Sequence, residues 1–382
     1  MANRFVLNET SYHGSGAISH IVPEIIGRGF QKVFVCADAE LIALGIVAKV
    51  TDLLDAEEVP YTVFSDIKAN PTIQNVQAGV AAFKESDADV IVAIGGGSVI
   101  DAAKAIGIII TNPAFADVRS LEGVASTKNK CVPIIAVATT AGTAAEVTIN
   151  YVITDVEKNR KMVCVDVHDI PVVAIVDPDM MASMPKGLTA ATGMDALTHA
   201  IEGYITRGAW KMSDMLHLEA IALIATHLRG AVANTAEGRE GMALGQYIAG
   251  MGFSNVGLGI VHSMAHPLGA LYDTPHGVAN AILLPTVMEY NAPATGEKYR
   301  DIAKAMGVIN TEAMTIEDAR NAAISAVKQL SGDVGIPTDL KDIVKKEDVD
   351  FLAQSAYDDA CRPGNPKDTS VDDIRELYIS LL

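Results

Sequence analysis

The sequence predicts an α/β plus α protein, in which an N-terminal Rossmann-like domain with a parallel sheet precedes a C-terminal all-helical domain. The chain has 382 residues, more than one hydrophobic core usually supports, so two domains are expected. Up to about residue 177, short apolar runs alternate with helical patterns, which is typical of a parallel sheet covered on both faces. After Pro185 such runs almost vanish and helical periodicity prevails. Pro178 and Pro185 mark the boundary, which gives domains of residues 1–182 and 183–382.

The strands are predicted from continuous runs of β-prone residues that are apolar on both faces, as in a buried parallel sheet. They cover residues 32–37, 61–64, 89–94, 132–138 and 172–176. A helical pattern at residues 72–86 separates the second strand from the third, as a connection between parallel strands requires. In the C-terminal half, the clearest helical patterns cover residues 316–330 and 371–382.

Composition disfavours several classes of partner. Hydrophobic residues make up 49% of the chain and charged residues 20%, so packed domains are expected. The formal net charge of −18 repels phosphate backbones and anionic lipids, which argues against nucleic acid and membrane partners. An uncharged stretch at residues 241–272 contains polar residues and many glycines, so we expect packed helices there and no membrane span. Four cysteines without a CxxC pair favour a reduced, cytoplasmic setting.

A glycine-rich loop follows the predicted strand at residues 89–94. Gly95, Gly96 and Gly97 allow the backbone to approach a phosphate, and the N-terminus of the following helix favours its negative charge. Ser98 is placed to cap that helix and to donate its hydroxyl. The spacing matches neither the dinucleotide fingerprint nor a Walker loop. Taken alone, the loop also fits a plain tight turn.

Two further strand ends supply candidates for nucleotide binding. Thr139, Thr140 and Thr143 surround Gly142 after the strand at residues 132–138, at the edge of the sheet where ligands bind in open α/β folds. Asp38 follows the first strand and is placed to accept hydrogen bonds from ribose hydroxyls. Its charge would repel a 2′-phosphate, so NAD is favoured over NADP. An isolated Asp at a strand end is also commonly a simple turn residue.

Histidines and one aspartate form two clusters in the C-terminal half. Asp195 and His199 are four residues apart in a predicted helix, which places both on one face. His262, His266 and His276 fall within fifteen residues, although the chain has only 9 histidines. Each alone fits an ordinary core or surface residue, whereas the set predicts a divalent metal site. Three imidazoles and a carboxylate suit Zn²⁺ nearly as well as Fe²⁺.

Several motifs in this order resemble those of the iron-containing (group III) alcohol dehydrogenases, and the resemblance runs nearly end to end. It departs from the family pattern at Val99, where proline is usual, at Ala144, where glycine is usual, and at Thr286, where histidine is frequent. The motifs are Gly95-Gly-Gly-Ser98-x-x-Asp101-x-x-Lys104, Thr139-Thr-Ala-Gly-Thr-Ala-Ala-Glu146, Gly193-x-Asp195-x-x-x-His199 and His262-x-x-x-His266-Pro-Leu-Gly269 with His276-Gly277.

The resemblance implies a homodimer of two-domain subunits, each binding NAD and one ferrous ion. His266 would lie beside the metal as the catalytic proton-relay group, and Phe253 and Cys361 would line the substrate pocket. The metal ligands would be Asp195, His199, His262 and His276. Together with Asp38, the cofactor-binding residues would be Asn70, Gly96, Gly97, Ser98, Asp101, Thr139, Thr140, Thr143, Asn150, Val152 and Lys161.

The activity implied is NAD- and iron-dependent interconversion of a short-chain 2-hydroxyaldehyde and its alcohol. Within the family, the closest resemblance is to members that act on lactaldehyde and 1,2-propanediol. The metal would polarise the carbonyl oxygen, and the reaction would take place between the two domains. A general short-chain alcohol dehydrogenase and a non-catalytic binding protein are alternatives. A lyase of the dehydroquinate-synthase type would need basic residues for an anionic substrate, but residues 241–272 contain no Lys or Arg.

Overall fold

The computed structural model describes residues 2–382, and the chain forms two compact units. The first unit contains Met1–Thr140 and Ala144–Ser183, and the second contains Ala141–Thr143 and Met184–Leu382. The short segment Ala141–Thr143 is therefore grouped with the second unit, although it follows a strand of the first. The boundary drawn from the sequence at residues 182 and 183 stays a prediction about independent domains.

The first unit contains a six-stranded sheet with the order β1-β9-β6-β4-β2-β3, and all of its neighbouring strands are parallel. All five predicted strands are present in it. The sixth, β1, was not predicted because it is a short edge strand without a fully buried residue. The strands are β1 (Thr10–His13), β2 (Val33–Cys36), β3 (Tyr61–Phe64), β4 (Val90–Gly95), β6 (Ile134–Ala138) and β9 (Val173–Val176).

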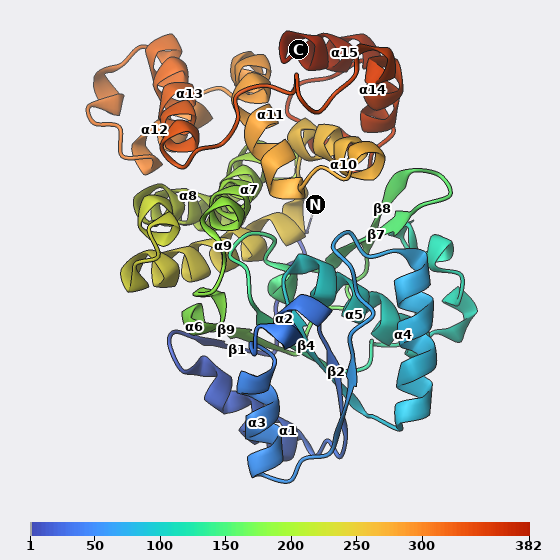
Figure 1. The fold of residues 1–382 in the computed structure, drawn as a ribbon. Coiled ribbons are helices and arrows are strands. Elements are labelled where there is room, and N and C mark those ends of the chain that lie inside the picture. The colour runs from blue at the N-terminus through green and yellow to red at the C-terminus, as the bar shows by residue number, and fades with distance from the viewer. Residues whose placement is uncertain (1) are drawn as a thin grey trace. The chain divides into compact units, whose positions relative to one another are not determined.

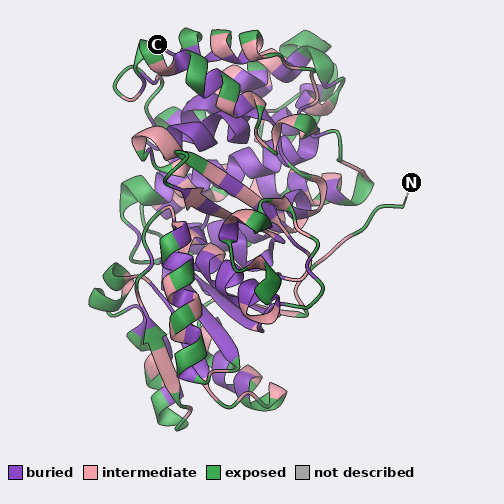
Figure 2. Ribbon diagram, turned by 90° about the vertical axis from the view of Figure 1, so that its right-hand side faces the viewer, coloured by how far each residue is buried: buried purple, intermediate pink, exposed green. Residues whose placement is uncertain are grey.

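Helices cover both faces of this sheet, because successive strand residues point to opposite sides. Phe34 and Cys36 of β2 pack in a core with α4 and α5, whereas Val33 and Val35 pack in a second core with α1 and α3. The four central strands, β2, β4, β6 and β9, are buried, and the covering helices expose their outer sides to solvent (Figure 2). The helices of this unit are α1 (Ile21–Arg28), α2 (Ala39–Ala43), α3 (Ala48–Ala56), α4 (Ile73–Ser86), α5 (Gly97–Thr111) and α6 (Pro178–Met181).

The order of the strands reverses between β2 and β4. From β2 the chain runs through α3 to β3 at one edge, and from β4 it runs through α5 towards β6, β9 and the other edge (Figure 1). The connections that leave β2 and β4 therefore run to opposite faces of the sheet. Such a switch point is where open α/β sheets bind ligands, at the carboxyl ends of the strands.

A small second sheet accompanies the first unit, with the order β5-β8-β7. It consists of β5 (Gly123–Val124), β7 (Asn150–Asp155) and β8 (Arg160–Val165), and β7 pairs with β8 in antiparallel fashion. This hairpin was not predicted. Both of its strands alternate between buried and partly exposed residues, so they lack the continuous apolar runs of strands that are buried on both faces.

The second unit is helical, and no strand is assigned to it among the described residues. The predicted architecture of a Rossmann-like part followed by a helical part is therefore confirmed. Two of these helices, α9 and α10, cover the uncharged stretch, as expected. The helices are α7 (Lys186–Ile205), α8 (Lys211–Val232), α9 (Ala236–Val256), α10 (Ile260–Tyr272), α11 (His276–Asn291), α12 (Lys298–Ala305), α13 (Ile316–Asp333), α14 (Val349–Tyr357) and α15 (Val371–Ser380).

Within the described residues, α8 is the one helix long and apolar enough by composition to cross a membrane. It carries Asp214, Glu219 and Arg229, and it packs against α7 and α9. Charged residues on a helix that packs between neighbours are ordinary in the core of a folded domain and rare in membrane spans. Length and composition alone are therefore weak support for a span here.

Candidate active site

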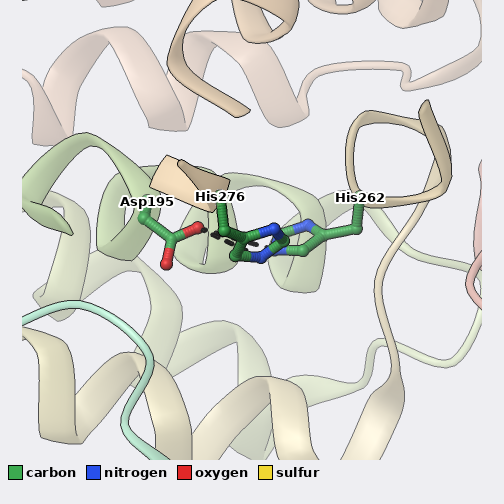
Figure 3. Close-up of side chains that lie close together, drawn as sticks. All are labelled: Asp195, His262 and His276. Carbon is green, nitrogen blue, oxygen red and sulfur yellow. Dashed lines mark ion pairs between the residues drawn. The ribbon is translucent and has the colours of Figure 1, made fainter. Parts of the chain in front are cut away.

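Three of the predicted metal ligands converge in the second unit, and we call Asp195, His262 and His276 the metal cluster. They come from α7, α10 and α11, respectively. Asp195 Oδ1 lies 3.8 Å from His262 Nε2 and 3.7 Å from His276 Nε2 (Figure 3). A tetrahedral ion with ligands roughly 2.1 Å away holds them roughly 3.4 Å apart. The three atoms therefore need only a small movement to bind one divalent ion.

The side-chain amide of Asn280 lies between the three ligand atoms. Asn280 Nδ2 donates to Asp195 Oδ1 at 2.6 Å, and it lies 3.2 Å from His262 Nε2 and 3.1 Å from His276 Nε2. Asn280 comes one turn after His276 in α11, so a single helix supplies both side chains. The ligand atoms thus face one point, and the group found there carries a partial positive charge. That is the environment a cation requires.

Glu202, which was not among the predicted site residues, contacts the metal-cluster residue His262 on the side away from its Nε2. Its Oε2 lies 2.6 Å from His262 Nδ1, and its Oε1 accepts the Val261 backbone N–H at 2.7 Å. Burial raises the pKa of Glu202 to about 7, although the backbone N–H groups of Val261 and His262 oppose this. A carboxylate beside Nδ1 holds the proton on that nitrogen and turns the Nε2 lone pair towards the metal.

Glutamine in place of Glu202 is expected to weaken metal binding by roughly 10–100-fold, because the imidazole of His262 loses its anionic partner. The affinity is measured on metal-free protein by competition with a chromogenic chelator. Glu240→Gln, at an exposed position of α9, is the matched control and should leave the affinity unchanged. Equal affinities in the two variants would show that Glu202 only fills space.

His199 lies beside the metal cluster, but it is not one of the three residues whose ligand atoms lie within 4.8 Å of one another. Its ring stacks on Phe253, with centroids 4.2 Å apart, and lies 4.4 Å from the ring of His262. Burial lowers the pKa of His199 to about 3, so the imidazole is neutral and able to bind a metal. Its Nδ1 is buried without a hydrogen-bond partner among residues 2–382. A buried nitrogen left unpaired is costly, and this fits a ring that belongs to a ligand set.

His266 is paired with the carboxylate of Asp359, which no spacing in the sequence predicts. His266 Nδ1 lies 2.7 Å from Asp359 Oδ2, and each side chain is 7% exposed. Burial raises the pKa of Asp359, but the neighbouring imidazole outweighs this and the pKa lies below its usual range. The other oxygen, Asp359 Oδ1, accepts the backbone N–H of Cys361 at 2.8 Å. Asp359 thus fixes the imidazole with its Nε2 available for proton transfer.

The two predicted substrate-pocket residues belong to the same unit. Phe253, in α9, is buried and stacks on His199, whereas Cys361 is partly exposed and follows Asp359 in the chain. The side chain of His276 is 25% exposed, in contrast to 2% for the other two residues of the metal cluster. The metal cluster is therefore accessible from the His276 side.

The start of α11 requires a glycine after His276. A Cβ atom at Gly277 would lie 2.4 Å from the carbonyl oxygen of Ala191 in α7, which is backbone and cannot move aside. The close approach of these two helices brings His276 towards Asp195. The His-Gly pair of the family motif therefore has a packing reason.

The glycine-rich loop lies at the switch point of the sheet. β4 ends at Gly95, and α5 begins at Gly97, with Gly96 as its N-cap. The expectation that Ser98 caps the helix is wrong, because Ser98 Oγ accepts the backbone N–H of Asn70 at 3.3 Å instead. A Cβ atom at Gly96 would lie 2.9 Å from Thr140 Cγ2, so Gly96 brings the two predicted cofactor loops together.

Several other predicted cofactor residues are connected with one another near this loop. Asn70 has a left-handed backbone, with φ 56°, and its Oδ1 accepts from Lys161 Nζ at 2.8 Å. Asp101 Oδ2 accepts the backbone N–H of Val152 at 3.0 Å. Burial raises the pKa of Asp101 to about 6, against the opposing effects of Lys104 and that N–H group. The structure thus gives Asp101 a supporting role between α5 and β7.

Lys104 was part of the glycine-loop motif, but its role was not foreseen. It is fully buried, and its Nζ donates to the carbonyl oxygens of Thr148 at 2.6 Å and Asn150 at 2.8 Å. Burial lowers its pKa, opposed by Asp169, Asp101 and Glu146. Lys104 therefore fixes the backbone at Asn150, one of the predicted cofactor residues.

The remaining predicted cofactor residues lie in strand-end loops. Asp38 follows β2 and is the N-cap of α2, accepting the Leu41 backbone N–H at 2.7 Å through Oδ1. Asp38 therefore does act as a turn residue, through its hydrogen bond to Leu41. Thr139 and Thr140 follow β6, and the Thr139 N–H donates to the carbonyl of Gly95. Thr143 falls in the segment grouped with the second unit.

Ala144, where the family usually has glycine, has φ 51°. This left-handed conformation explains the family's preference, since an alanine there is strained and a glycine is not. Val99 packs in a core of the first unit without strain of this kind. Nothing in the structure explains the threonine at position 286.

Family models match both halves of the chain. The model described as iron-containing alcohol dehydrogenase matches residues 8–178, and the C-terminal model of the Fe-containing alcohol dehydrogenase family matches residues 189–382. The chain is 61% identical over 379 residues to lactaldehyde reductase of Escherichia coli strain K12, with 99% of each chain covered.

Solved structures agree with this assignment. A crystal structure of 1,3-propanediol oxidoreductase superposes with a TM-score of 0.96 at 40% identity, and all of both chains is covered. Sulfoacetaldehyde reductase from Bifidobacterium kashiwanohense, solved in complex with NAD⁺, gives a TM-score of 0.87 at 28% identity, covering 100% of this chain and 99% of that one. On these findings, the chain belongs to the iron-containing alcohol dehydrogenase family.

Proposed function

We propose that this chain interconverts lactaldehyde and 1,2-propanediol, using NAD and iron. Membership of the family makes it an NAD-dependent, metal-containing alcohol dehydrogenase that acts on short-chain alcohols and aldehydes. The convergence of the metal cluster on one point, with Glu202 behind it, is the observation that carries the catalytic assignment. The substrate proposal is supported by the 61% identity with a lactaldehyde reductase over nearly the full length.

The metal cluster and His199 fit a divalent ion, since they offer one carboxylate and three neutral imidazoles. When bound, Fe²⁺ supplies Lewis-acid polarisation of the carbonyl group, and NAD(H) carries the hydride. Asp195 and Glu202 contribute the negative charge that balances the cation. Binding of an ion would require the Asn280 amide to move away from the point between these ligand atoms.

His266 is the group placed to move the proton in this reaction. Reduction of an aldehyde leaves negative charge on its oxygen, and a positioned imidazole donates the proton that neutralises it. Its ring lies 6.2 Å from the ring of His262 and 5.5 Å from that of His276, centroid to centroid. Asp359 holds the proton on Nδ1 and stabilises the charged imidazole that forms in the reverse reaction.

A general short-chain alcohol dehydrogenase is the second candidate, favoured by a 42% identity with 1,3-propanediol dehydrogenase of Citrobacter freundii, which covers 98% of this chain and 97% of that one. Phe253 and Cys361, if they line the pocket as proposed, favour small aldehydes over bulky ones. The family match decides against the lyase alternative and against a non-catalytic protein.

A panel of aldehydes, assayed with NADH on protein loaded separately with Fe²⁺ and Zn²⁺, tests the proposal. Lactaldehyde and glycolaldehyde should give the highest kcat/KM, with a gradual decline as the chain lengthens, because one methylene changes specificity by only about 1–3 kcal/mol. A steady rise of kcat/KM towards six-carbon or aromatic aldehydes would favour the general alcohol dehydrogenase instead.

The preference for NAD over NADP is proposed to come from Asp38. Asp38→Asn removes the charge but keeps an oxygen for the Leu41 N–H, whereas Asp38→Gly removes the charge and the side-chain cap. Both variants should use NADPH better relative to NADH, since the lost repulsion amounts to about 1–3 kcal/mol. Ratios of kcat/KM for the two cofactors measure this. If this ratio stays at the wild-type value in both variants, Asp38 does not contact the cofactor ribose.

A homodimer and a cytoplasmic location stay predictions. The resemblance to the family supports the dimer, and light scattering of the purified protein measures it. The absence of a CxxC pair among the 4 cysteines supports a reduced compartment.

A further inference from the structure

We propose that His266, Asp359 and Cys361 form a second metal site, distinct from the metal cluster, that takes a soft divalent cation such as Zn²⁺. The three residues offer one imidazole nitrogen, one carboxylate oxygen and one thiol sulfur. Their potential ligand atoms all lie within 4.8 Å of one another, the same limit that the metal cluster meets. Among residues 2–382, these are the two groups of three that do so.

The geometry of this second site is fixed by hydrogen bonds. His266 Nδ1 lies 2.7 Å from Asp359 Oδ2, and Asp359 Oδ1 accepts the Cys361 backbone N–H at 2.8 Å. His266 comes from α10, whereas the other two residues follow α14 in a short segment. Because His266 and Asp359 are nearly buried and Cys361 is partly exposed, the donors are ordered and still reachable from solvent.

The donor set selects the kind of ion. A sulfur, a nitrogen and an oxygen donor together suit Zn²⁺, which commonly takes three protein ligands and leaves one position open. The guanidinium of the next residue, Arg362, contacts Tyr357 and lies 4.2 Å from the centroid of its ring. The carboxylate of Asp359 brings a negative charge within 4.8 Å of the other two donor atoms. The local charge therefore favours a cation.

Binding at this site would change two proton positions. The thiol of Cys361 would lose its proton to solvent, and a sulfur–metal bond would replace the S–H bond. If the imidazole binds through Nδ1, its proton moves to Nε2, so one proton is released for each ion. An imidazole in this state has no free nitrogen to accept a proton. A second ion would therefore block the relay proposed for His266.

Cobalt titration of the full-length, metal-free protein tests the proposal by a readout that does not depend on dehydrogenase activity. Only the second site contains a thiol, so only there can Co²⁺ give a thiolate-to-metal charge-transfer band in the near ultraviolet. We expect this band to grow to one equivalent in the wild type. It should persist in Asp195→Ala, which impairs the metal cluster, and vanish in Cys361→Ser.

Cys131→Ser is the matched control, since Cys131 is buried in the first unit and belongs to no group of three potential ligands in the described chain. Its band should equal that of the wild type. Absence of the band in the wild type at two equivalents of Co²⁺ would overturn the proposal, as would its persistence in Cys361→Ser. The cobalt band does not depend on activity towards aldehydes. The proposed function and the proposed second metal site can therefore be rejected independently of each other.

A second measurement connects the site to turnover. Added Zn²⁺ should inhibit the iron-loaded enzyme, and Cys361→Ser should raise the inhibitory concentration by roughly 10-fold or more when each variant is compared with its own zinc-free rate. Equal inhibitory concentrations in both proteins would mean that zinc acts only by replacing iron at the metal cluster.

Discussion

Alanine in place of His262 or Asp195 is expected to release the metal and to lower kcat by at least roughly 10³-fold, while NAD binding persists. Each residue supplies one of three converging ligand atoms, and the loss of a Lewis acid removes several kcal/mol of transition-state stabilisation. The predicted cofactor residues lie almost entirely in the first unit, so NAD affinity should change little. Metal content is measured by atomic emission, and NADH binding by fluorescence titration.

His227→Gln, on α8 and outside the site, is the control for loss of an imidazole. It should keep both metal and activity. Thermal melting of each variant separates loss of ligand from loss of fold, because His262→Ala also leaves the buried Glu202 carboxyl without its partner. Full metal occupancy in both alanine variants would remove these residues from the ligand set.

Asparagine in place of Asp359 is expected to lower kcat by roughly 10²-fold without loss of the metal. The amide can still accept the Cys361 N–H, so the loop keeps its hydrogen bond, but it cannot stabilise the charged form of His266. The shape of the profile of kcat against pH should change, because the imidazole loses its anionic neighbour.

Asp359→Glu is the conservative comparison and should recover part of the rate and part of the pH profile. A purely structural role would lower thermal stability in both variants and leave the shape of the pH profile unchanged. Iron content equal to that of the wild type is required before either rate is interpreted. An unshifted profile in Asp359→Asn would show that Asp359 does not position the proton-transfer group.

Much of the fold follows from local patterns. Strands such as Val90–Gly95 are buried on both faces, so their continuous apolar runs are visible in the sequence. Thr72 begins α4 with a capping box, which likewise depends on near neighbours. The hairpin of Asn150–Asp155 and Arg160–Val165 is half-exposed. Its strands contain polar residues and therefore no continuous apolar run that would predict them. The edge strand Thr10–His13 depends on pairing with Val173–Val176, which lies far along the chain.

The site residues, too, fall into those that local sequence patterns predict and those that depend on tertiary contacts. The spacing of Asp195 and His199 and the density of histidines from residue 262 to 276 were enough to suggest a metal centre. Glu202 had a usable signal, because it follows His199 by one turn of the same helix. Asp359 had none, since it lies 93 residues from His266 and meets it only through the packing of α14 and α10. Partners that act through tertiary contact cannot be read from spacing.

The arrangement of Glu202 and Asn280 around the metal cluster has a consequence for how the enzyme acquires its ion. Because the donor atoms are already oriented, loading does not depend on refolding, and any divalent ion of suitable size meets the same prepared ligands. Imidazole and carboxylate donors bind Zn²⁺ more tightly than Fe²⁺ in the general order of affinities. We therefore expect the supply of iron and zinc during synthesis to influence which metal the protein carries. Protein produced in iron-poor medium should carry the wrong metal while being correctly folded.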